Sequence, residues 1–211
     1  MPPMIKVHHL NNSRSQRVLW LLEELDQDYE IIGYQRDTTT NLAPDSLKKI
    51  HPLGKSPVVT DGAMTIAESG AIVDYLIRKY GRDRLMPAEH TADFVSYLHW
   101  MHYAEGSAML PVMLRLYVMR LAEAGAPLHP RIDSEVKNHF GYINEALGSN
   151  DFLVGNKLSG ADFQIVFVLE AARSLGLLSP FANLERYLSN IHERPAYKRG
   201  IERGGQYDLG K

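Results

Sequence analysis

The chain has 211 residues, of which 45% are apolar and 23% are charged, with a formal net charge of −2 and no cysteine. This composition is typical of an ordinary globular protein, and the length allows one large domain or two small ones. The absence of cysteine excludes a disulfide framework, a thiolate metal site and a cysteine nucleophile, and the lack of a basic surplus disfavours nucleic acid as a partner. No apolar run is long enough to span a membrane, and the amino terminus lacks a secretory signal, so we expect a cytoplasmic protein with no membrane partner.

The first part of the chain predicts a strand, a helix and a second strand. Residues 4–9 and 29–34 are rich in side chains that favour strands. Between them, apolar residues over 18–25 repeat at the spacing of one helix face. A strand, a helix and a strand within about thirty residues form a βαβ unit.

A second mixed segment follows a polar stretch that contains one short helix near 44–50. Asp61-Gly62 lies between two short apolar runs, which is the strongest short-range signal of a β-hairpin. Glu68 then begins a helix whose apolar positions continue to Tyr80. We therefore predict an α/β domain over residues 1–81.

The remainder of the chain has only helical patterns. Residues 82–89 show no periodicity and are interpreted as a linker. Helices are expected over 91–124, 131–147 and 160–175, followed by a last pair after Asn183 and Pro195. Pro111 should kink the first of these helices because it lacks a backbone donor. We predict an all-helical domain over residues 90–211.

Three motifs in the first domain carry candidate chemistry. The first is Asn11-Asn12-Ser13 at the start of the first helix. Ser13 and Gln16 have the spacing of a capping box, which by itself only begins a helix. A helix amino terminus also stabilises an anion, and a hydroxyl there can donate a hydrogen bond to a thiolate.

The second motif is the turn Lys55-Ser56-Pro57 before a strand, where Pro57 is a candidate for a cis bond that would leave the backbone of Ser56 free to pair with an extended peptide. The alternative is an ordinary trans proline loop.

The third motif is Glu68-Ser69 at a helix start, which is either favourable capping or a site for the α-amino-acid end of a ligand.

With these motifs in this order, the chain resembles the cytosolic glutathione transferases over nearly its whole length, and most closely their bacterial and fungal branch. Leu158–Phe163 is similar to the N-capping box of that family and has a structural role. The resemblance implies a thioredoxin-like α/β amino-terminal domain and an all-α helical carboxy-terminal domain. It also implies a homodimer and glutathione as co-substrate, with no metal ion.

The resemblance places Ser13 at the position of the catalytic serine in the serine-type classes. A tyrosine mechanism at that place is excluded, because the first tyrosine is Tyr29. Asn11 and Asn12 remain rival donors to the sulfur, since some related bacterial proteins use an amide.

The implied glutathione-binding residues are Ser13, Lys55, Ser56, Pro57, Glu68 and Ser69. Lys55 would contact the glycine end, the backbone of Ser56 would pair with the cysteinyl unit, and Glu68 with Ser69 would hold the γ-glutamyl end. Gly70 departs from several serine-type classes, which carry an arginine there, so one contact is expected to be missing.

The implied reaction is detoxification, in which the glutathione thiolate attacks the electrophilic carbon of a small hydrophobic partner. The electrophile pocket is expected between the halves, against the first long helix. Its candidate residues are Tyr103, Met109, Leu110 and Met113, which could equally form the bundle core. Two alternatives remain open: a glutathione-dependent peroxidase on the same scaffold, and a non-catalytic glutathione-binding or regulatory protein.

Overall fold

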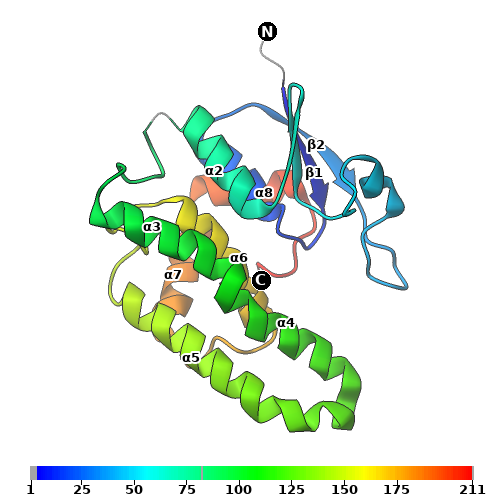
Figure 1. Ribbon diagram of the computed structural model, residues 1–211, viewed down its shortest axis with the longest axis vertical. Coiled ribbons are helices and arrows are strands. Elements are labelled where there is room, and N and C mark those ends of the chain that lie inside the picture. Colours follow the sequence, from blue (N-terminus) through cyan, green and yellow to red (C-terminus); the bar gives the residue numbers. More distant parts are fainter. Residues whose placement is uncertain (1–3, 82, 211) are drawn as a thin grey trace. The chain divides into compact units, whose positions relative to one another are not determined.

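The computed structural model describes residues 4–81 and 83–210, and its contacts divide the chain into two compact units (Figure 1). Unit 1 comprises residues 1–84 together with 192–211, and unit 2 comprises residues 85–191. Residues 1–3, 82 and 211, on which the expected amino terminus, the start of the linker and the last domain boundary fall, lie outside the described residues.

Unit 1 contains one sheet of four strands. Their bounds are β1 Ile5–Leu10, β2 Tyr29–Tyr34, β3 Val58–Asp61 and β4 Met64–Ala67. The strand order is β2-β1-β3-β4, with β1 parallel to β2 and β3 antiparallel to both β1 and β4. The parallel pair confirms the predicted βαβ unit, and the turn between β3 and β4 confirms the hairpin, since Gly62 has the φ of +61° that a tight turn requires.

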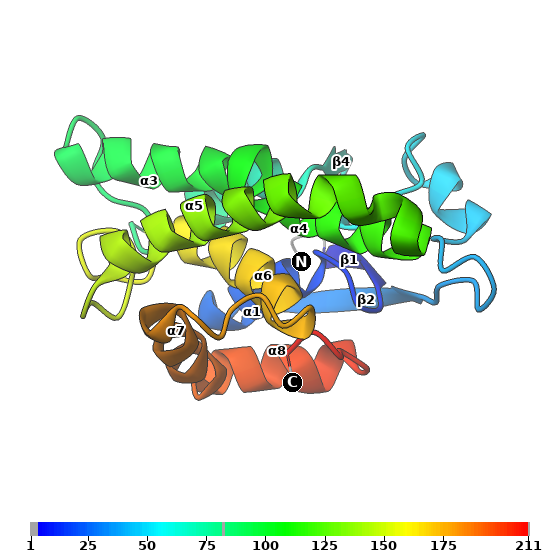
Figure 2. The same cartoon turned by 90° about the horizontal axis from the view of Figure 1, so that it is seen from below.

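Three helices belong to this unit. They are α1 Gln16–Glu24, α2 Ser69–Tyr80 and α8 Pro195–Gly204, with a short 3₁₀ turn at Asp45–Lys49. The helical pattern predicted that the last helix belongs to the all-helical half, but α8 packs along α1 in unit 1 (Figure 2). Gly200 permits this approach, because a Cβ there would lie only 3.0 Å from the backbone nitrogen of Trp20. Close backbone packing of this kind is a tertiary feature that helical periodicity does not report.

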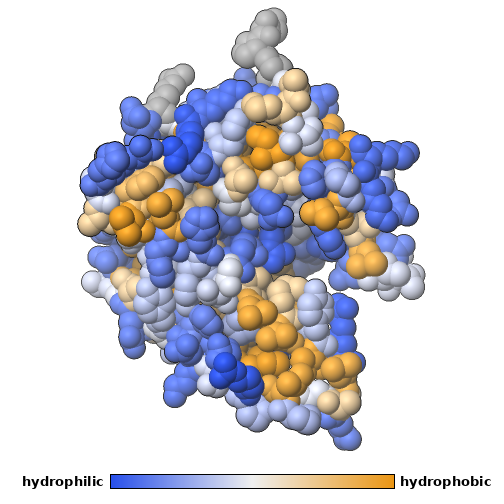
Figure 3. Space-filling model, viewed as in Figure 1, coloured by the Kyte–Doolittle hydropathy of each residue, from blue (hydrophilic) through white to orange (hydrophobic). Residues whose placement is uncertain are grey.

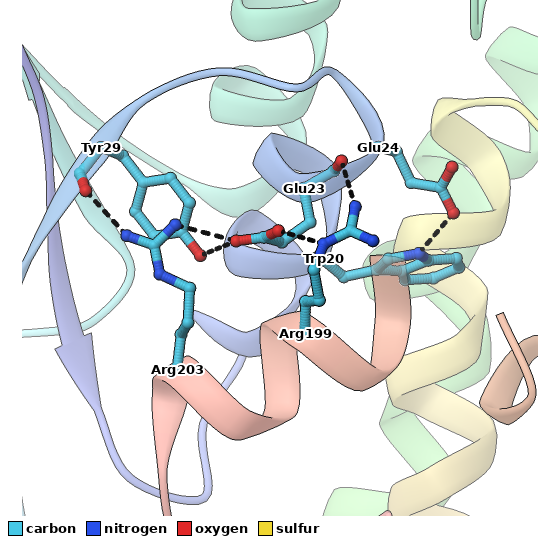
Figure 4. A network of polar contacts seen from close by, with 6 residues as sticks. All are labelled: Trp20, Glu23, Glu24, Tyr29, Arg199 and Arg203. Atoms are coloured by element: carbon cyan, nitrogen blue, oxygen red, sulfur yellow. Dashed lines mark hydrogen bonds and ion pairs between the residues drawn. The ribbon is translucent and has the colours of Figure 1, made fainter. Parts of the chain in front are cut away.

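A polar network also fastens α8 to α1 (Figure 4). Glu23 accepts hydrogen bonds from Arg199 at 2.8 Å and Arg203 at 2.9 Å, and from the Tyr29 hydroxyl at 2.8 Å. Burial alone would raise the pKa of Glu23, but the hydrogen bonds from these three side chains outweigh it and lower that pKa. The carboxylate is therefore held ionised between the two helices.

Unit 2 is helical throughout its regular elements. Its helices are α3 Ala92–Tyr103, α4 Met109–Val118, α5 His129–Leu147, α6 Gly160–Ser174 and α7 Ala182–His192. By their contacts α3 packs with α6, and α4 packs with α5. Across residues 4–81 and 83–210, no helix combines the length and the apolar character needed to cross a membrane.

The first long helix differs from the prediction for 91–124. A π-helical turn at Ala104–Ala108 separates α3 from α4, and Pro111 lies in the first turn of α4. Proline has no backbone N–H to donate to the carbonyl four residues earlier, and a widened helical turn lets the chain accommodate the loss of that hydrogen bond. After α4 the chain tightens into 3₁₀ geometry over Met119–Leu128, where Ala122 has a φ of +47°. The helix therefore ends earlier than the apolar periodicity indicated.

The start of α6 confirms the predicted capping box. Ser159 donates its backbone N–H to Asp162 at 2.8 Å, and the reciprocal bond from Asp162 to Ser159 is also present. The hydroxyl of Tyr187 on α7 donates to the same carboxylate at 2.7 Å. The box thus joins the beginning of one helix to the middle of another.

Candidate functional site

The loop between β1 and α1 holds the first motif. The predicted capping box of Ser13 and Gln16 is wrong, because the helix begins at Gln16 with Ser15 at its N-cap. The Ser13 hydroxyl instead accepts from the backbone N–H of Ser15 at 3.2 Å. The side-chain amide of Gln16 has no hydrogen-bond partner in the described part of the chain. Ser13 therefore lies one short turn before the helix, and its hydroxyl is at the amino terminus of α1, where the helix dipole is positive.

The two asparagines differ in how they are held. Asn12 has a φ of +50°, and its side chain is paired with Asp208 through two hydrogen bonds. Asn11 accepts from the backbone N–H of Arg36 at 3.1 Å through its side-chain oxygen. Its side-chain nitrogen donates to none of the residues 4–81 and 83–210. Asn11 is therefore the asparagine with a free donor.

The second motif lies against the end of β1. The Ser56–Pro57 bond is cis, which is one of the two alternatives that the sequence left open. The Ser56 hydroxyl donates to the carbonyl of His8 at 2.8 Å and accepts from the backbone N–H of Leu10 at 3.2 Å. Lys55 beside it is exposed. These bonds place the turn next to the loop that carries Ser13.

The third motif lies at the amino terminus of α2. Glu68 is an exposed residue with φ 71° and ψ 116°, a conformation that non-glycine residues rarely adopt and that is common at ligand sites. Ser69, the first helical residue, is buried and accepts a 2.8 Å hydrogen bond from Arg17 on α1. A buried cation thus lies at the amino terminus of α2, which is a favourable place for a carboxylate.

Two bridges therefore bring the three motifs together within unit 1. Leu10 joins the first motif to Ser56, and Arg17 joins it to Ser69. The arrangement offers two helix amino termini, one guanidinium and the turn that carries the cis proline. Such a set is suited to an extended, anionic peptide-like ligand.

Two family models match the chain: the glutathione S-transferase N-terminal domain over residues 2–78 and the glutathione S-transferase C-terminal domain over residues 85–195. The chain belongs to the glutathione S-transferase family. Glutathione S-transferase 3 of Schizosaccharomyces pombe is 35% identical over 215 residues, which cover 95% of this chain and 88% of that protein. A glutathione S-transferase crystal structure from Actinobacillus pleuropneumoniae has a TM-score of 0.90 at 34% identity and covers 99% of this chain and 96% of its own.

A glutathione transferase from Phanerochaete chrysosporium, solved with oxidized glutathione, is 22% identical, with a TM-score of 0.79 and coverage of 97% of this chain and 96% of its own. That likeness concerns the fold. Together with the family models it confirms the expected architecture, a thioredoxin-like α/β part and a helical part.

Arg17 is a further candidate site residue in this glutathione S-transferase family member, because it bonds to Ser69, and the sequence motifs do not include it. It lies in the otherwise apolar run from Arg17 to Leu22, and its side chain is buried. A buried guanidinium requires a specific partner, so a lone arginine on an apolar helix face was the available signal.

The candidates for the electrophile pocket all lie in unit 2, around the π-helical turn. Met109 is buried in the unit, whereas Leu110 is exposed and Met113 is half-buried. Tyr103 forms a 2.5 Å hydrogen bond with His139, and burial, Tyr142 and Glu135 raise its pKa to about 12. Its hydroxyl therefore stays protonated at neutral pH and is suited to hydrogen bonding.

Proposed function

We propose that this family member is a glutathione transferase that binds glutathione in unit 1 and conjugates its sulfur to a hydrophobic electrophile. The observation that supports this most directly is the pair of bridges that joins the three motifs, Leu10 to Ser56 and Arg17 to Ser69. The solved relative with oxidized glutathione makes glutathione the natural ligand to assign to such a site.

Each part of glutathione has a counterpart in this proposal. The γ-glutamyl end would lie at Glu68 and Ser69, with the Glu68 carboxylate toward the ammonium. The cysteinyl backbone would pair with Ser56 beside Pro57. Lys55 would take the glycine carboxylate. Arg17 would supply a positive charge near the γ-glutamyl carboxylate, where Gly70 leaves the family's arginine contact missing.

The proposed mechanism is stabilisation of the thiolate by Ser13. A free thiol titrates near pH 8.5, and lowering its pKa by about two units requires about 2.7 kcal/mol. One hydrogen bond to a charged group contributes about 1.5–3 kcal/mol, and the amino terminus of α1 adds its positive potential. The thiolate then attacks the electrophilic carbon, and the protein supplies placement and the anion site.

The test is the ultraviolet absorbance of the thiolate as glutathione is titrated onto the protein across pH. Wild type should show a bound thiol with a pKa near neutrality, and Ser13→Ala should raise that pKa by about one to two units. Asn11→Ala is the matched comparison, because the free nitrogen of Asn11 makes it the rival donor. A raised pKa in Asn11→Ala and none in Ser13→Ala would assign the role to Asn11.

Two other functions use the same site. A peroxidase would direct the thiolate at a hydroperoxide, and turnover with cumene hydroperoxide but not with chlorodinitrobenzene would identify it. A binding or regulatory protein would retain glutathione without ionising the thiol. The absorbance titration separates that case from both enzymes.

We further propose a cytoplasmic homodimer. Unit 2 exposes a group of apolar side chains over α4 and the 3₁₀ segment, seen as the large orange area in the lower part of Figure 3. The exposed aliphatic side chains of this group are Leu110, Leu114, Met119, Leu121 and Leu128, and the ring of Tyr117 is exposed in the same segment. Contiguous apolar surface of this kind favours association. Sedimentation at micromolar concentration measures the oligomeric state, and a monomer would contradict the proposal.

A further inference from the structure

A chain of hydrogen bonds runs behind Ser13 into the core of unit 1. The Ser13 and Ser15 hydroxyl oxygens are 2.8 Å apart, and the Ser15 hydroxyl oxygen is 2.8 Å from Nδ1 of His9. Ser13, Ser15 and His9 are all buried, with exposed fractions of 6%, 0% and 4%. The chain therefore links the proposed sulfur donor to a histidine that solvent does not reach.

A hydroxyl has one hydrogen, so the direction of such a chain is set at one end. If Nδ1 of His9 accepts, Ser15 donates to it, and Ser13 must donate to Ser15. If Nδ1 carries the hydrogen, His9 donates to Ser15, and the Ser15 hydrogen turns to Ser13. Only the second arrangement leaves the Ser13 hydrogen free to point away from the protein core.

The surroundings of His9 favour the second arrangement. Its other ring nitrogen, Nε2, has no hydrogen-bond partner within the part of the chain that the structure describes, and the buried Gln16 amide makes no bond to it. Burial lowers the pKa of His9, and the nearby backbone of Gly204 partly opposes that effect. The distance and angle between Gly204 and Nε2 of His9 do not meet those of a hydrogen bond. A hydrogen on Nε2 would thus be a buried donor without an acceptor, which is unfavourable.

Ser15 has the contacts to serve as the intermediate. Its hydroxyl also accepts from the Leu10 backbone N–H at 3.3 Å, and its hydrogen has two acceptors within reach, the Leu10 carbonyl at 3.2 Å and Ser13 at 2.8 Å. With Nδ1–H of His9 and the Leu10 N–H filling its two acceptor positions, its single hydrogen is directed to the nearer of these two acceptors, Ser13. The Ser13 oxygen then accepts from the Ser15 hydroxyl as well as from the Ser15 backbone N–H.

We infer that His9 and Ser15 are positioning residues that turn the hydroxyl hydrogen of Ser13 toward the sulfur of glutathione. In the thiolate complex, Nδ1–H of His9 donates to Ser15, Ser15 donates to Ser13, and Ser13 donates to the sulfur. No proton is transferred. The histidine stays neutral, and its only effect is to set the direction of the hydrogen bonds through Ser15 and Ser13. This inference rests on the proposed function, because it needs Ser13 to be the donor.

The test is the pKa of the bound glutathione thiol in matched variants. Ser15→Ala and His9→Leu should each raise it by about half to one unit, less than Ser13→Ala does. His9→Asn should restore it to within about a quarter of a unit, because an amide nitrogen can donate in place of Nδ1. His8→Leu is the control, since His8 neighbours His9 in β1 but its ring bonds to Tyr34 and Thr60 instead.

A spectroscopic measurement on the unaltered protein does not depend on how well these variants fold. NMR of nitrogen-labelled histidine should show His9 with its hydrogen on Nδ1 when glutathione is bound. A hydrogen on Nε2, or thiol pKa values unchanged in both Ser15→Ala and His9→Leu while Ser13→Ala raises the pKa, would overturn this inference alone. An unchanged pKa in Ser13→Ala would instead overturn the proposed role of Ser13 and this inference with it.

Discussion

Asn12 and Asp208 are 196 positions apart, and their side chains and backbone form a two-point hydrogen bond within unit 1. The Asn12 amide nitrogen donates to the Asp208 carboxylate at 3.0 Å, and the Asp208 backbone N–H donates to the Asn12 side-chain oxygen at 2.7 Å. The pair fixes the segment after α8 to the loop that carries Ser13. It also occupies the amide of Asn12, so this residue is a poor donor to sulfur.

This pair predicts a compensating double variant. Asn12→Asp places two carboxylates against each other and should lower the free energy of unfolding by about 1–2 kcal/mol. Asp208→Asn combined with it restores a donor and an acceptor, and should recover about 1 kcal/mol. Urea unfolding of the two single variants and the double variant measures the coupling. Additive effects of the two changes would show that the pair is not an energetic contact.

The Glu23 network predicts a loss of stability at neutral pH. Glu23→Gln removes the charge that Arg199 and Arg203 share, and should lower the free energy of unfolding by about 1–2 kcal/mol. Glu30→Gln is the control. Glu30 pairs with Lys6 at 3.6 Å, with both side chains about half exposed, and should change stability by less than about 0.5 kcal/mol.

The same network predicts how this difference depends on pH. The pKa of Glu23 is lowered in the folded protein relative to its ordinary value of 4.5, so the unfolded chain takes up a proton first as the pH falls. The stabilisation is therefore fully present above about pH 4.5 and is lost as the pH falls through the lower folded pKa. The difference in free energy of unfolding between wild type and Glu23→Gln should therefore decrease as the pH falls below about 4.5. A difference that stays constant down to the acid transition would contradict this assignment.

The capping box of α6 predicts a larger effect in unit 2. Asp162→Ala leaves the Ser159 N–H and the Tyr187 hydroxyl without their acceptor in a buried place, and should cost about 3 kcal/mol. Tyr187→Phe removes one of these bonds and should cost about 1 kcal/mol. Thr91→Ala at the exposed start of α3 is the comparison and should cost about 1 kcal/mol or less. Equal losses for Asp162→Ala and Thr91→Ala would show that burial of the box adds nothing.

Arg17 predicts a change in ligand affinity. Arg17→Met should raise the Kd for glutathione about tenfold, because it removes the proposed positive charge beside Ser69. Arg17→Lys should recover little, since a lysine does not reproduce the planar guanidinium. Calorimetric titration gives the Kd, and Arg78→Met on the exposed face of α2 serves as the control. A similar loss of affinity for cysteinylglycine, which has no γ-glutamyl group, would contradict the proposed place of Arg17.

The sequence by itself determined the elements and the motifs of this protein. The apolar spacing over 18–25, the Asp61-Gly62 turn and the box at Ser159 and Asp162 are local signals, and each produced the expected structure. Local signals also located the three site motifs, because helix starts and proline turns are written in short stretches of chain.

Only the tertiary structure decided which of these pieces meet. Residues far apart in sequence leave no periodic trace of their contact, so the packing of α8 on α1 and the pairing of Asn12 with Asp208 required coordinates. For the same reason, the sequence does not distinguish Asn11 from Asn12. Only the coordinates show that the Asn12 side chain is bonded to Asp208 and that the Asn11 side chain is bonded through its oxygen to Arg36. The tertiary structure also turned Ser13 from a predicted helix cap into the outer end of a buried hydrogen-bond chain to His9, because the N-cap place is taken by Ser15.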